Sequence, residues 1–509
     1  MAYHKSIYLF LFLPAVLCTY QLAPQKWRWK VLLGYSYLFF FFISRQLILL
    51  FIATTAWTYW IGHMLYGQDR SKKKKRIILS VGILVLLGVL FFLKYSPWSA
   101  ENINALLEKT DTAYRIPVIT WALPIGISFY TLQAVGYMVD IYWGKVKPEK
   151  HPGKLALFLA FFPQIMEGPI CSYSDTADSL WEGRPVKEEN LRAGCIRILW
   201  GLFKKMVVAD RMYLLVKTVF DGYEGYGGAA VIAAAIGYTI QLYMEFSGTM
   251  DIIIGNGWMF GIRLPENFRQ PFCSRSASEF WKRWHITLGA WFRTYIFYPI
   301  SVSGMLKKWN RYGRKHAGKY MTKLTAYACG LFPVWLCNGL WHGARWSYIF
   351  YGMYYFVLIL LGIAFEPVHS RLMSLCHIDP SSALLRRLQI LKTWCIIFIG
   401  ELFFRADSLS IGMKMFASIF REFRPEQLWD GTLLTLGLDG NDYAVILAGC
   451  VIAAVVGALK ERKTDIQEKL QKSCVLVRWG VCYGLIFAVI IFGAYGAGYL
   501  QVDLIYAGF

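Results

Sequence analysis

Two histidines occupy apolar stretches of the chain, where an ionisable side chain is uncommon. His342 lies in NGLWHGARW, residues 338 to 346, and His285 lies in SEFWKRWHITLGAWF, residues 278 to 292. A neutral imidazole, with an ordinary pKa of about 6.5, can take a proton near neutral pH and return it later. Both histidines are therefore candidates for general base chemistry on a hydroxyl group.

Small and flat residues surround His342. Gly339 lies one helical turn before it and Gly343 follows it directly, so side chains are missing where another molecule could approach. Asn338 adds a polar group and Trp341 a flat apolar one. The pattern predicts a narrow passage with one imidazole in its wall. The four neighbouring residues named above are predicted to contact the substrate.

His285 is predicted to lie on one short helix. Ser276 and Glu279 have the spacing of a capping box, which predicts a helix start, and Pro299 ends the segment. Five residues share one face of that helix, and the first two are predicted substrate contacts: Trp281, Trp284, His285, Leu288 and Phe292. The segment is too charged for a plain span, so we expect a re-entrant or interfacial helix that lines a protein cavity. A core histidine bonded to a carbonyl is the alternative for His285.

The surrounding chain is built to lie in a membrane. It has 509 residues with 56% hydrophobic and only 17% charged residues, and a mean hydropathy of +0.40. Because about 20 apolar residues cross a bilayer as a helix, we predict an all-α polytopic protein with about 11–13 transmembrane helices. The apolar segments are 6–22, 31–43, 46–66, 77–95, 117–143, 154–166, 198–220, 227–247, 325–341, 346–365, 393–407, 443–459 and 479–500.

Positive charge is gathered between these segments. The formal net charge is +22, and in a membrane protein such an excess marks cytoplasmic loops, so we do not expect nucleic acid binding. If each basic cluster lies on the cytoplasmic side, the number of spans after the last cluster places the C-terminus outside, in a multi-pass protein of the cell membrane. The clusters could also attract an acidic donor such as coenzyme A or a carrier protein. They cover residues 69–76, 307–323, 384–392 and 460–473.

The sequence lacks the motifs of several other classes of protein and site. The eleven cysteines are scattered singly without a CxxC pair, so we expect no disulfide and no metal site. The absence of GxSxG and of a Walker A loop disfavours a covalent serine enzyme and an ATP-driven pump. A proton-coupled transporter stays as an alternative, although no internal repeat is visible. Four acids in the apolar zone are interpreted as structural, with Arg263 and Arg405 as partners: Glu167, Glu245, Asp251 and Glu401.

The histidine stretches resemble the membrane-bound O-acyltransferase family, in its bacterial polysaccharide branch. The resemblance covers roughly residues 120–410 and rests on FWKRWHITLGAWFR at 280–293 and GLWHG at 339–343. Further matches are FFPQIMEGPI at 161–170, YMEFSGTMDIIIGNGWMFGIRLPENFRQPF at 243–272 and FFRA at 403–406. The chain departs from the commoner branch pattern at Glu245, Thr249 and Met250.

This resemblance implies a fold and a reaction. The fold would be helices around a central tunnel, in a single domain with N-terminal helices at 1–116, a core at 117–410 and C-terminal helices at 411–509. His342 would be the general base, and His285 would either orient the substrate or support the reacting geometry. The donor would be acetyl-CoA or an acyl carrier thioester, with no bound cofactor. The acceptor would be a cell-surface polysaccharide, reached with the help of an extracytoplasmic acyltransferase or esterase-like partner protein.

The tail VDLIYAGF, residues 502–509, resembles a motif that is proposed in this branch to carry the acyl group on its tyrosine. The resemblance implies that Tyr506 accepts the acyl group near His342 and passes it to an extracellular enzyme. A tyrosine that anchors the last helix at the membrane interface is the alternative. D-alanyl transfer and lipid acylation by the same fold also stay open.

Overall fold

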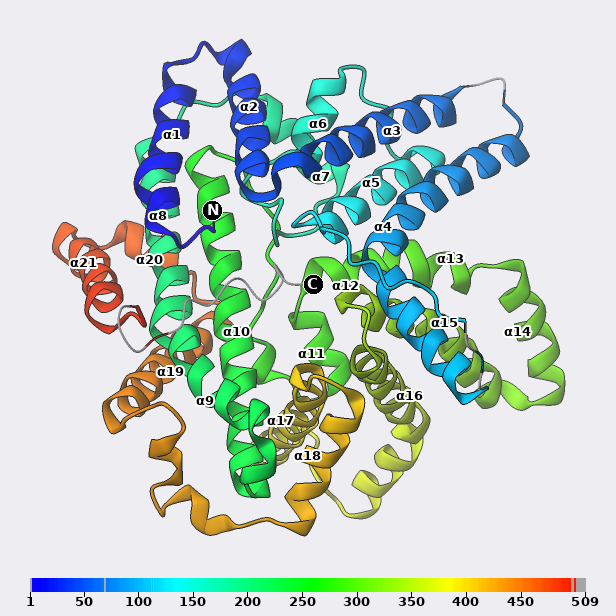
Figure 1. Cartoon of the computed structure of the whole chain (residues 1–509), viewed down its shortest axis with the longest axis vertical. Helices are drawn as coiled ribbons and strands as arrows, with labels where there is room; N and C mark the ends of the chain where they lie inside the picture. Colours follow the sequence, from blue (N-terminus) through cyan, green and yellow to red (C-terminus); the bar gives the residue numbers. More distant parts are fainter. Residues whose placement is uncertain (1, 68–69, 111, 113, 496–498, 500–509) are drawn as a thin grey trace. The chain divides into compact units, whose positions relative to one another are not determined.

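The computed structural model describes residues 2–67, 70–110, 112, 114–495 and 499, and within them the chain is helical with no strand (Figure 1). The all-α prediction is confirmed. The chain forms two compact units, the first from residues 1–202 and 249–266 and the second from 203–248 and 267–502. Both histidines belong to the second unit. The division of the chain at residues 116 and 410 stays a prediction.

The first unit holds the N-terminal helices. They are η1 (Tyr8–Phe12), α1 (Leu13–Leu22), α2 (Gln25–Ser44), η2 (Arg45–Leu47), α3 (Ile48–Tyr66), α4 (Lys72–Lys109), α5 (Ile127–Tyr142), α6 (Pro152–Ala160), α7 (Tyr173–Trp181) and α8 (Glu188–Leu202). Helix α10 (Gly228–Met259) has residues in both units.

The second unit carries the rest of the helices. They are η3 (Phe203–Ala209), α9 (Asp210–Asp221), η4 (Tyr223–Gly225), η5 (Pro271–Cys273), α11 (Ala277–Arg283), α12 (Ile286–Phe292), η6 (Arg293–Phe297), α13 (Tyr298–Ser301), α14 (Gly304–His316), α15 (Gly318–His342), α16 (Trp346–Leu375), α17 (Ala383–Arg405), α18 (Leu409–Arg421), η7 (Pro425–Leu428), η8 (Thr432–Thr435), α19 (Gly440–Glu461), α20 (Ile466–Lys472) and α21 (Val475–Phe492).

Long apolar helices confirm a multi-pass membrane protein. In the described part of the chain, 6 helices are long and apolar enough to cross a bilayer: α3, α4, α10, α16, α19 and α21. The expected spans do not match helices one for one, because several apolar runs form short or interrupted helices. The run at 154–166, for example, is helical only as far as Ala160, where the nine-residue helix α6 ends.

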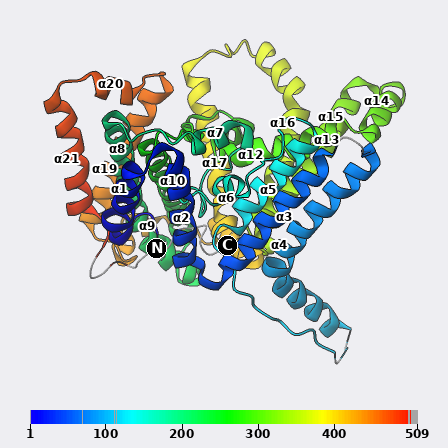
Figure 2. The same cartoon turned by 90° about the horizontal axis from the view of Figure 1, so that it is seen from above.

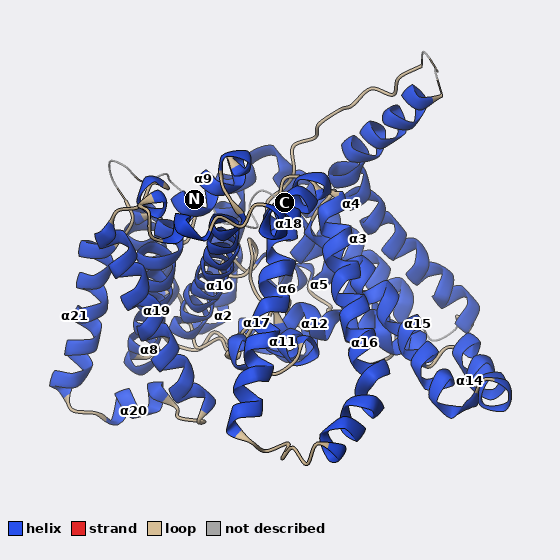
Figure 3. Ribbon diagram, turned by 90° about the horizontal axis from the view of Figure 1, so that it is seen from below, coloured by secondary structure: helices blue, strands red, loops and turns tan. Residues whose placement is uncertain are grey.

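Three of the basic clusters lie along one edge of the second unit. Helix α14, the connection between α16 and α17, and helix α20 are found at the same edge in both side views (Figures 2 and 3). Helices α14 and α20 contain residues 307–316 and 466–472 of the predicted cytoplasmic clusters, and residues 384–392 form the first turns of α17, directly after the connection. Their common edge is the arrangement that the excess of positive charge on one side of a membrane requires.

Two of the four predicted structural acids pair with cations, but not with the arginines expected from the sequence, and Glu401 accepts a hydrogen bond from a tyrosine hydroxyl. Unpaired charge in a helical bundle is costly, so each acid needs a partner nearby. Lysine and arginine side chains from other helices supply the ion-pair partners, and the sequence alone did not indicate which residues these would be. The ion pairs of these acids are Asp251 with Arg197 at 3.0 Å and Glu245 with Lys205 at 3.6 Å, whereas Arg405 lies 3.8 Å from the exposed Asp221.

Helices α15 and α16 approach each other closely through two glycines. A Cβ atom on Gly339 would overlap the carbonyl oxygen of Tyr348 and lie 3.1 Å from its carbonyl carbon. A Cβ on Gly352 would likewise overlap the carbonyl oxygen of Trp335 and lie 3.2 Å from the nitrogen of Gly339. Small residues at facing positions let helix backbones pack tightly in membranes. This contact fixes the end of α15, where His342 lies.

Candidate active site

His342 is the last residue of α15 and is buried, with 4% of its surface exposed. The helix ends because Gly343 has φ 157° and ψ 173°, a conformation that is nearly restricted to glycine. The imidazole lies nearly perpendicular to the ring of Phe404, with centroids 4.8 Å apart, and to the ring of Tyr351 at 6.0 Å. The sequence prediction had identified neither aromatic residue as part of this site.

His285 does not lie within one continuous helix, so that prediction is wrong. Helix α11 ends at Arg283, Trp284 is extended, and His285 has φ 45° and ψ 52° before α12 begins at Ile286. The left-handed conformation is uncommon for a residue with a side chain, and it is found where surrounding contacts impose it. Because the helix is interrupted here, helical spacing does not describe the positions of His285 and the residues after it relative to α11.

Asn267 holds this break in place. Its Oδ1 atom accepts hydrogen bonds from the Thr287 backbone N–H and the Thr287 hydroxyl, both at 3.0 Å. The Ile286 N–H donates to the Asn267 carbonyl, also at 3.0 Å. One asparagine therefore caps the start of α12 and fixes the chain on both sides of His285. Sequence reasoning missed Asn267, although it stands in the quoted PENFRQPF stretch.

The same amide oxygen determines the tautomer of His285. The His285 Nδ1 atom lies 3.2 Å from Asn267 Oδ1. Because this oxygen already accepts from a backbone N–H, it is an acceptor, and Nδ1 must carry the proton. In the neutral ring Nε2 is then the basic nitrogen. Asn267 Oδ1 is an amide carbonyl oxygen, so the structure agrees with a core histidine bonded to a carbonyl, and a catalytic role for His285 stays a prediction.

Trp341 lies between the two histidines. Its ring centroid is 5.4 Å from that of His285 and 4.9 Å from that of His342. The structure thus brings the two imidazoles to the same site from residues 57 positions apart in the sequence. A buried site in which one indole contacts both rings excludes water from them, which strengthens electrostatic interactions.

Two of the predicted substrate contacts, Asn338 and Trp281, lie near His342, whereas Trp284 lies in another aromatic cluster. Asn338 is buried on α15 one turn before His342, and among the described residues its Oδ1 atom has no hydrogen-bond partner. Trp281 packs against Tyr355 at 5.0 Å and Tyr351 at 6.1 Å, so it belongs to the wall around His342. Trp284 instead packs among other aromatic residues, with Phe268 at 5.1 Å.

Gly339 plays a different part from the one expected. We predicted that it leaves room for a substrate, but the carbonyl group of Tyr348 on α16 fills that room. The correction has a simple physical reason. A missing side chain admits any close neighbour, and in this structure the neighbour is another helix. Gly343 terminates α15, and Tyr506 lies outside the described residues.

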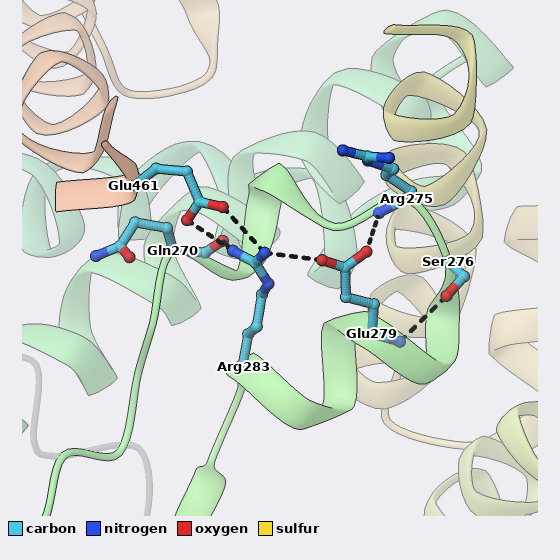
Figure 4. A network of polar contacts seen from close by, with 6 residues as sticks. All are labelled: Gln270, Arg275, Ser276, Glu279, Arg283 and Glu461. Atoms are coloured by element: carbon cyan, nitrogen blue, oxygen red, sulfur yellow. Dashed lines mark hydrogen bonds and ion pairs between the residues drawn. The ribbon is translucent and has the colours of Figure 1, made fainter. Parts of the chain in front are cut away.

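A polar network holds α11, the helix before His285 (Figure 4). The predicted helix start is confirmed, since the Ser276 hydroxyl accepts from the Glu279 N–H at 3.2 Å. The Glu279 carboxylate accepts from the Arg275 N–H at 2.9 Å and from Arg283 at 2.8 Å. Arg283 also donates to Glu461 at 2.7 Å, which ties α11 to the end of α19.

The arrangement suits proton transfer at an apolar site. Two imidazoles, one of them held in a defined tautomer, can accept a proton from a hydroxyl group and donate it to a leaving group. In the part of the chain that the structure describes, no group of three His, Cys, Asp or Glu side chains could hold a metal ion. The site therefore offers acid–base groups and aromatic surface, together with a buried amide.

Comparisons with known proteins agree with this site. The sequence model of the membrane-bound O-acyltransferase family matches residues 151–313. The chain is 32% identical to the probable alginate O-acetylase AlgI of Azotobacter vinelandii, over 90% of this chain and 85% of the relative. It is 27% identical to the peptidoglycan O-acetyltransferase of Helicobacter pylori, over 82% of this chain and 79% of the relative.

A third relative covers less of the chain. The teichoic acid D-alanyltransferase of Bacillus subtilis is 29% identical over 48% of this chain and 59% of the relative. The long match to the first relative, together with the matched family model and the paired histidines, establishes the family. This chain belongs to the membrane-bound O-acyltransferase family and is an O-acyltransferase.

Proposed function

We propose that this enzyme moves a short acyl group, acetyl, from a cytoplasmic thioester to hydroxyl groups of a cell-surface polysaccharide. The observation that carries the proposal is the buried pair of histidines around Trp341. The long relatives are named as acetylating enzymes of alginate and peptidoglycan, and the D-alanyl relative matches only about half of the chain. These matches favour acetyl over D-alanyl transfer and a polymer over a lipid acceptor.

His342 is the general base in this proposal. Its neutral imidazole takes the proton of the acceptor hydroxyl while the oxygen attacks the thioester carbonyl carbon. The new C–O bond forms, the C–S bond breaks, and the thiolate takes the proton from the imidazolium, so the histidine is regenerated. As the last residue of α15, His342 stands at the negative end of a helix dipole, which favours a transient positive charge.

His285 and Asn338 orient the substrates. With Nδ1 donating to Asn267, His285 presents Nε2 as a hydrogen-bond acceptor for a hydroxyl. Asn338 offers a buried amide one turn from the base, suited to a polar group of the donor or the oxyanion. A tunnel through the helices would admit the thioester from the cytoplasmic side and the acceptor from the outer side.

Tyr506 is the proposed acyl carrier at the outer side. Its phenol, with an ordinary pKa of about 10, needs a base to act as a nucleophile, and His342 would serve. A partner protein outside the membrane would then move the acyl group from the tyrosine to the polysaccharide. The cytoplasmic thioester is acetyl-CoA or an acylated carrier protein, which the basic cytoplasmic segments would attract.

Replacement of His342 with alanine tests the base directly. The variant should stay in the membrane at the wild-type level and lose the O-acetyl esters of the surface polysaccharide, measured by NMR on extracted polymer. Ester at the wild-type level would show that His342 is not the base. Solute uptake by the wild-type protein without consumption of a thioester would instead support a transporter.

A second experiment addresses the carrier. Tyr506→Phe should abolish transfer to the polymer, and the intact mass of the wild-type protein with saturating donor should increase by one acyl group. A wild-type mass without an adduct, together with normal ester formation by Tyr506→Phe, would remove the carrier from the scheme. It would leave direct transfer at His342 intact.

A further inference from the structure

Tyr351 and Glu401 form a buried pair beside His342. The Tyr351 hydroxyl, on α16, donates to the Glu401 Oε1 atom, on α17, at 3.0 Å. Both side chains are buried, with 2% and 1% of their surfaces exposed. The proposed mechanism uses neither residue, and their role is therefore open.

Tyr351 belongs to a group of three rings that includes the imidazole. Its centroid is 6.0 Å from that of His342 and 4.9 Å from that of Phe404, and Phe404 is 4.8 Å from His342. Glu401 and Phe404 are three residues apart on α17 and so share a face of that helix. That face therefore holds Tyr351 at two points, the hydroxyl through Glu401 and the ring through Phe404.

Stability alone gives no reason for a carboxyl group at this position. Among the described residues Glu401 forms no ion pair, and its Oε2 atom has no hydrogen-bond partner. A buried carboxyl group with one hydrogen bond costs free energy, and an apolar side chain of similar size would commonly serve stability as well or better. Such a residue inside a membrane bundle is a functional candidate by default.

We propose that Glu401 is a positioning residue for acyl transfer: through its hydrogen bond to Tyr351 it fixes the ring that keeps the His342 imidazole in its reactive orientation. The inference rests on the proposed role of His342 as the base. A freed Tyr351 ring could rotate or shift, and the imidazole beside it would follow. Displacement of a catalytic group by 1 Å can cost on the order of a hundredfold in rate.

The chain contains a matched control for a role in helix packing. The Tyr354 hydroxyl also joins α16 to α17, because it donates to the Ile396 carbonyl at 2.9 Å. Its ring packs against Tyr355 at 5.1 Å, and within the described residues it makes no ring contact with His342. Tyr351→Phe and Tyr354→Phe each delete one hydroxyl between the same two helices, so a packing role predicts equal effects.

The experiment measures acetyl-CoA-dependent thiol release by the purified full-length protein in lipid nanodiscs, with kcat, KM and thermal stability for each variant. We expect Tyr351→Phe to lower kcat about tenfold with little change in KM, as the loss of one buried hydrogen bond allows. Tyr354→Phe should keep the wild-type kcat, while both variants lose similar stability. Glu401→Gln keeps an acceptor oxygen and should stay within about threefold of wild type.

The coupling between the two residues completes the test. Glu401→Leu should match Tyr351→Phe in kcat, and the double variant should be no worse than either single variant, because one interaction is lost in all three. If Glu401→Leu does not accumulate, the comparison of Glu401→Gln with Tyr351→Phe decides the question.

The results separate the two proposals. Wild-type kcat in Tyr351→Phe, an equal loss of kcat in Tyr354→Phe, or additive losses in the double variant would overturn the positioning role. Thiol release that survives His342→Ala would overturn the proposed base itself.

Discussion

Replacement of Gly339 with alanine should separate helices α15 and α16 and displace His342 without touching the imidazole. The new Cβ atom would overlap the Tyr348 carbonyl oxygen and lie 3.2 Å from the Ile349 Cα atom. Both are backbone atoms, which cannot rotate away as a flexible side chain could. Restoring an ordinary contact of 3.4 Å requires a separation of about 1 Å in a closely packed interior.

The magnitude follows from two opposing terms. Overpacking a helix contact costs about 1–3 kcal/mol, and alanine regains up to about 1 kcal/mol of helix propensity relative to glycine. We therefore expect a net loss of about 1–2 kcal/mol in stability. The effect on rate should be larger, since a 1 Å displacement of a catalytic group costs on the order of a hundredfold.

The assay compares Gly339→Ala, in α15, with the control variant Gly362→Ala, in α16. A Cβ atom at Gly362, in α16, would meet nothing within 4 Å, so that variant should keep its activity and unfold at the wild-type temperature or slightly above it. Acyl transfer and thermal unfolding are measured on both proteins in nanodiscs. Wild-type activity and stability in Gly339→Ala would refute the reasoning that the glycine contact positions His342.

Three further predictions follow from polar contacts. Asn267→Ala removes the cap of α12 and the hydrogen bond to His285. Acyl transfer should therefore fall by at least about tenfold and the free energy of unfolding by about 1–2 kcal/mol, and an unchanged rate of acyl transfer would contradict this. Arg211→Ala removes the guanidinium that donates to the Tyr499 hydroxyl at 2.6 Å and leaves Asp442, at 2.8 Å, as its partner. Hydrogen exchange at Tyr499 should therefore accelerate, and equal exchange would refute the anchor. Glu461→Gln weakens a partly exposed pair, and its small loss of unfolding temperature should vanish at high salt, unlike a packing defect.

Several features could be read from residues close in the sequence. Apolar runs near the length of a bilayer predicted a multi-pass all-α membrane protein, although not its individual spans, and Ser276 with Glu279 predicted where α11 begins. The two histidine stretches identified the chemistry before any fold was known. Each of these signals is local, because a cap or an apolar run acts on the residues that contain it.

The partners of the histidines were decided by the tertiary structure alone. The helix break at His285 depends on Asn267, which lies in a separate segment, and helical periodicity continues across the break as though it were absent. The Tyr351–Glu401 bond joins residues 50 positions apart, and the room at Gly339 is taken by α16. The physical reason is the same in each case. A sequence pattern reports which face of an element is apolar, whereas the neighbour on that face is chosen by how the helices pack.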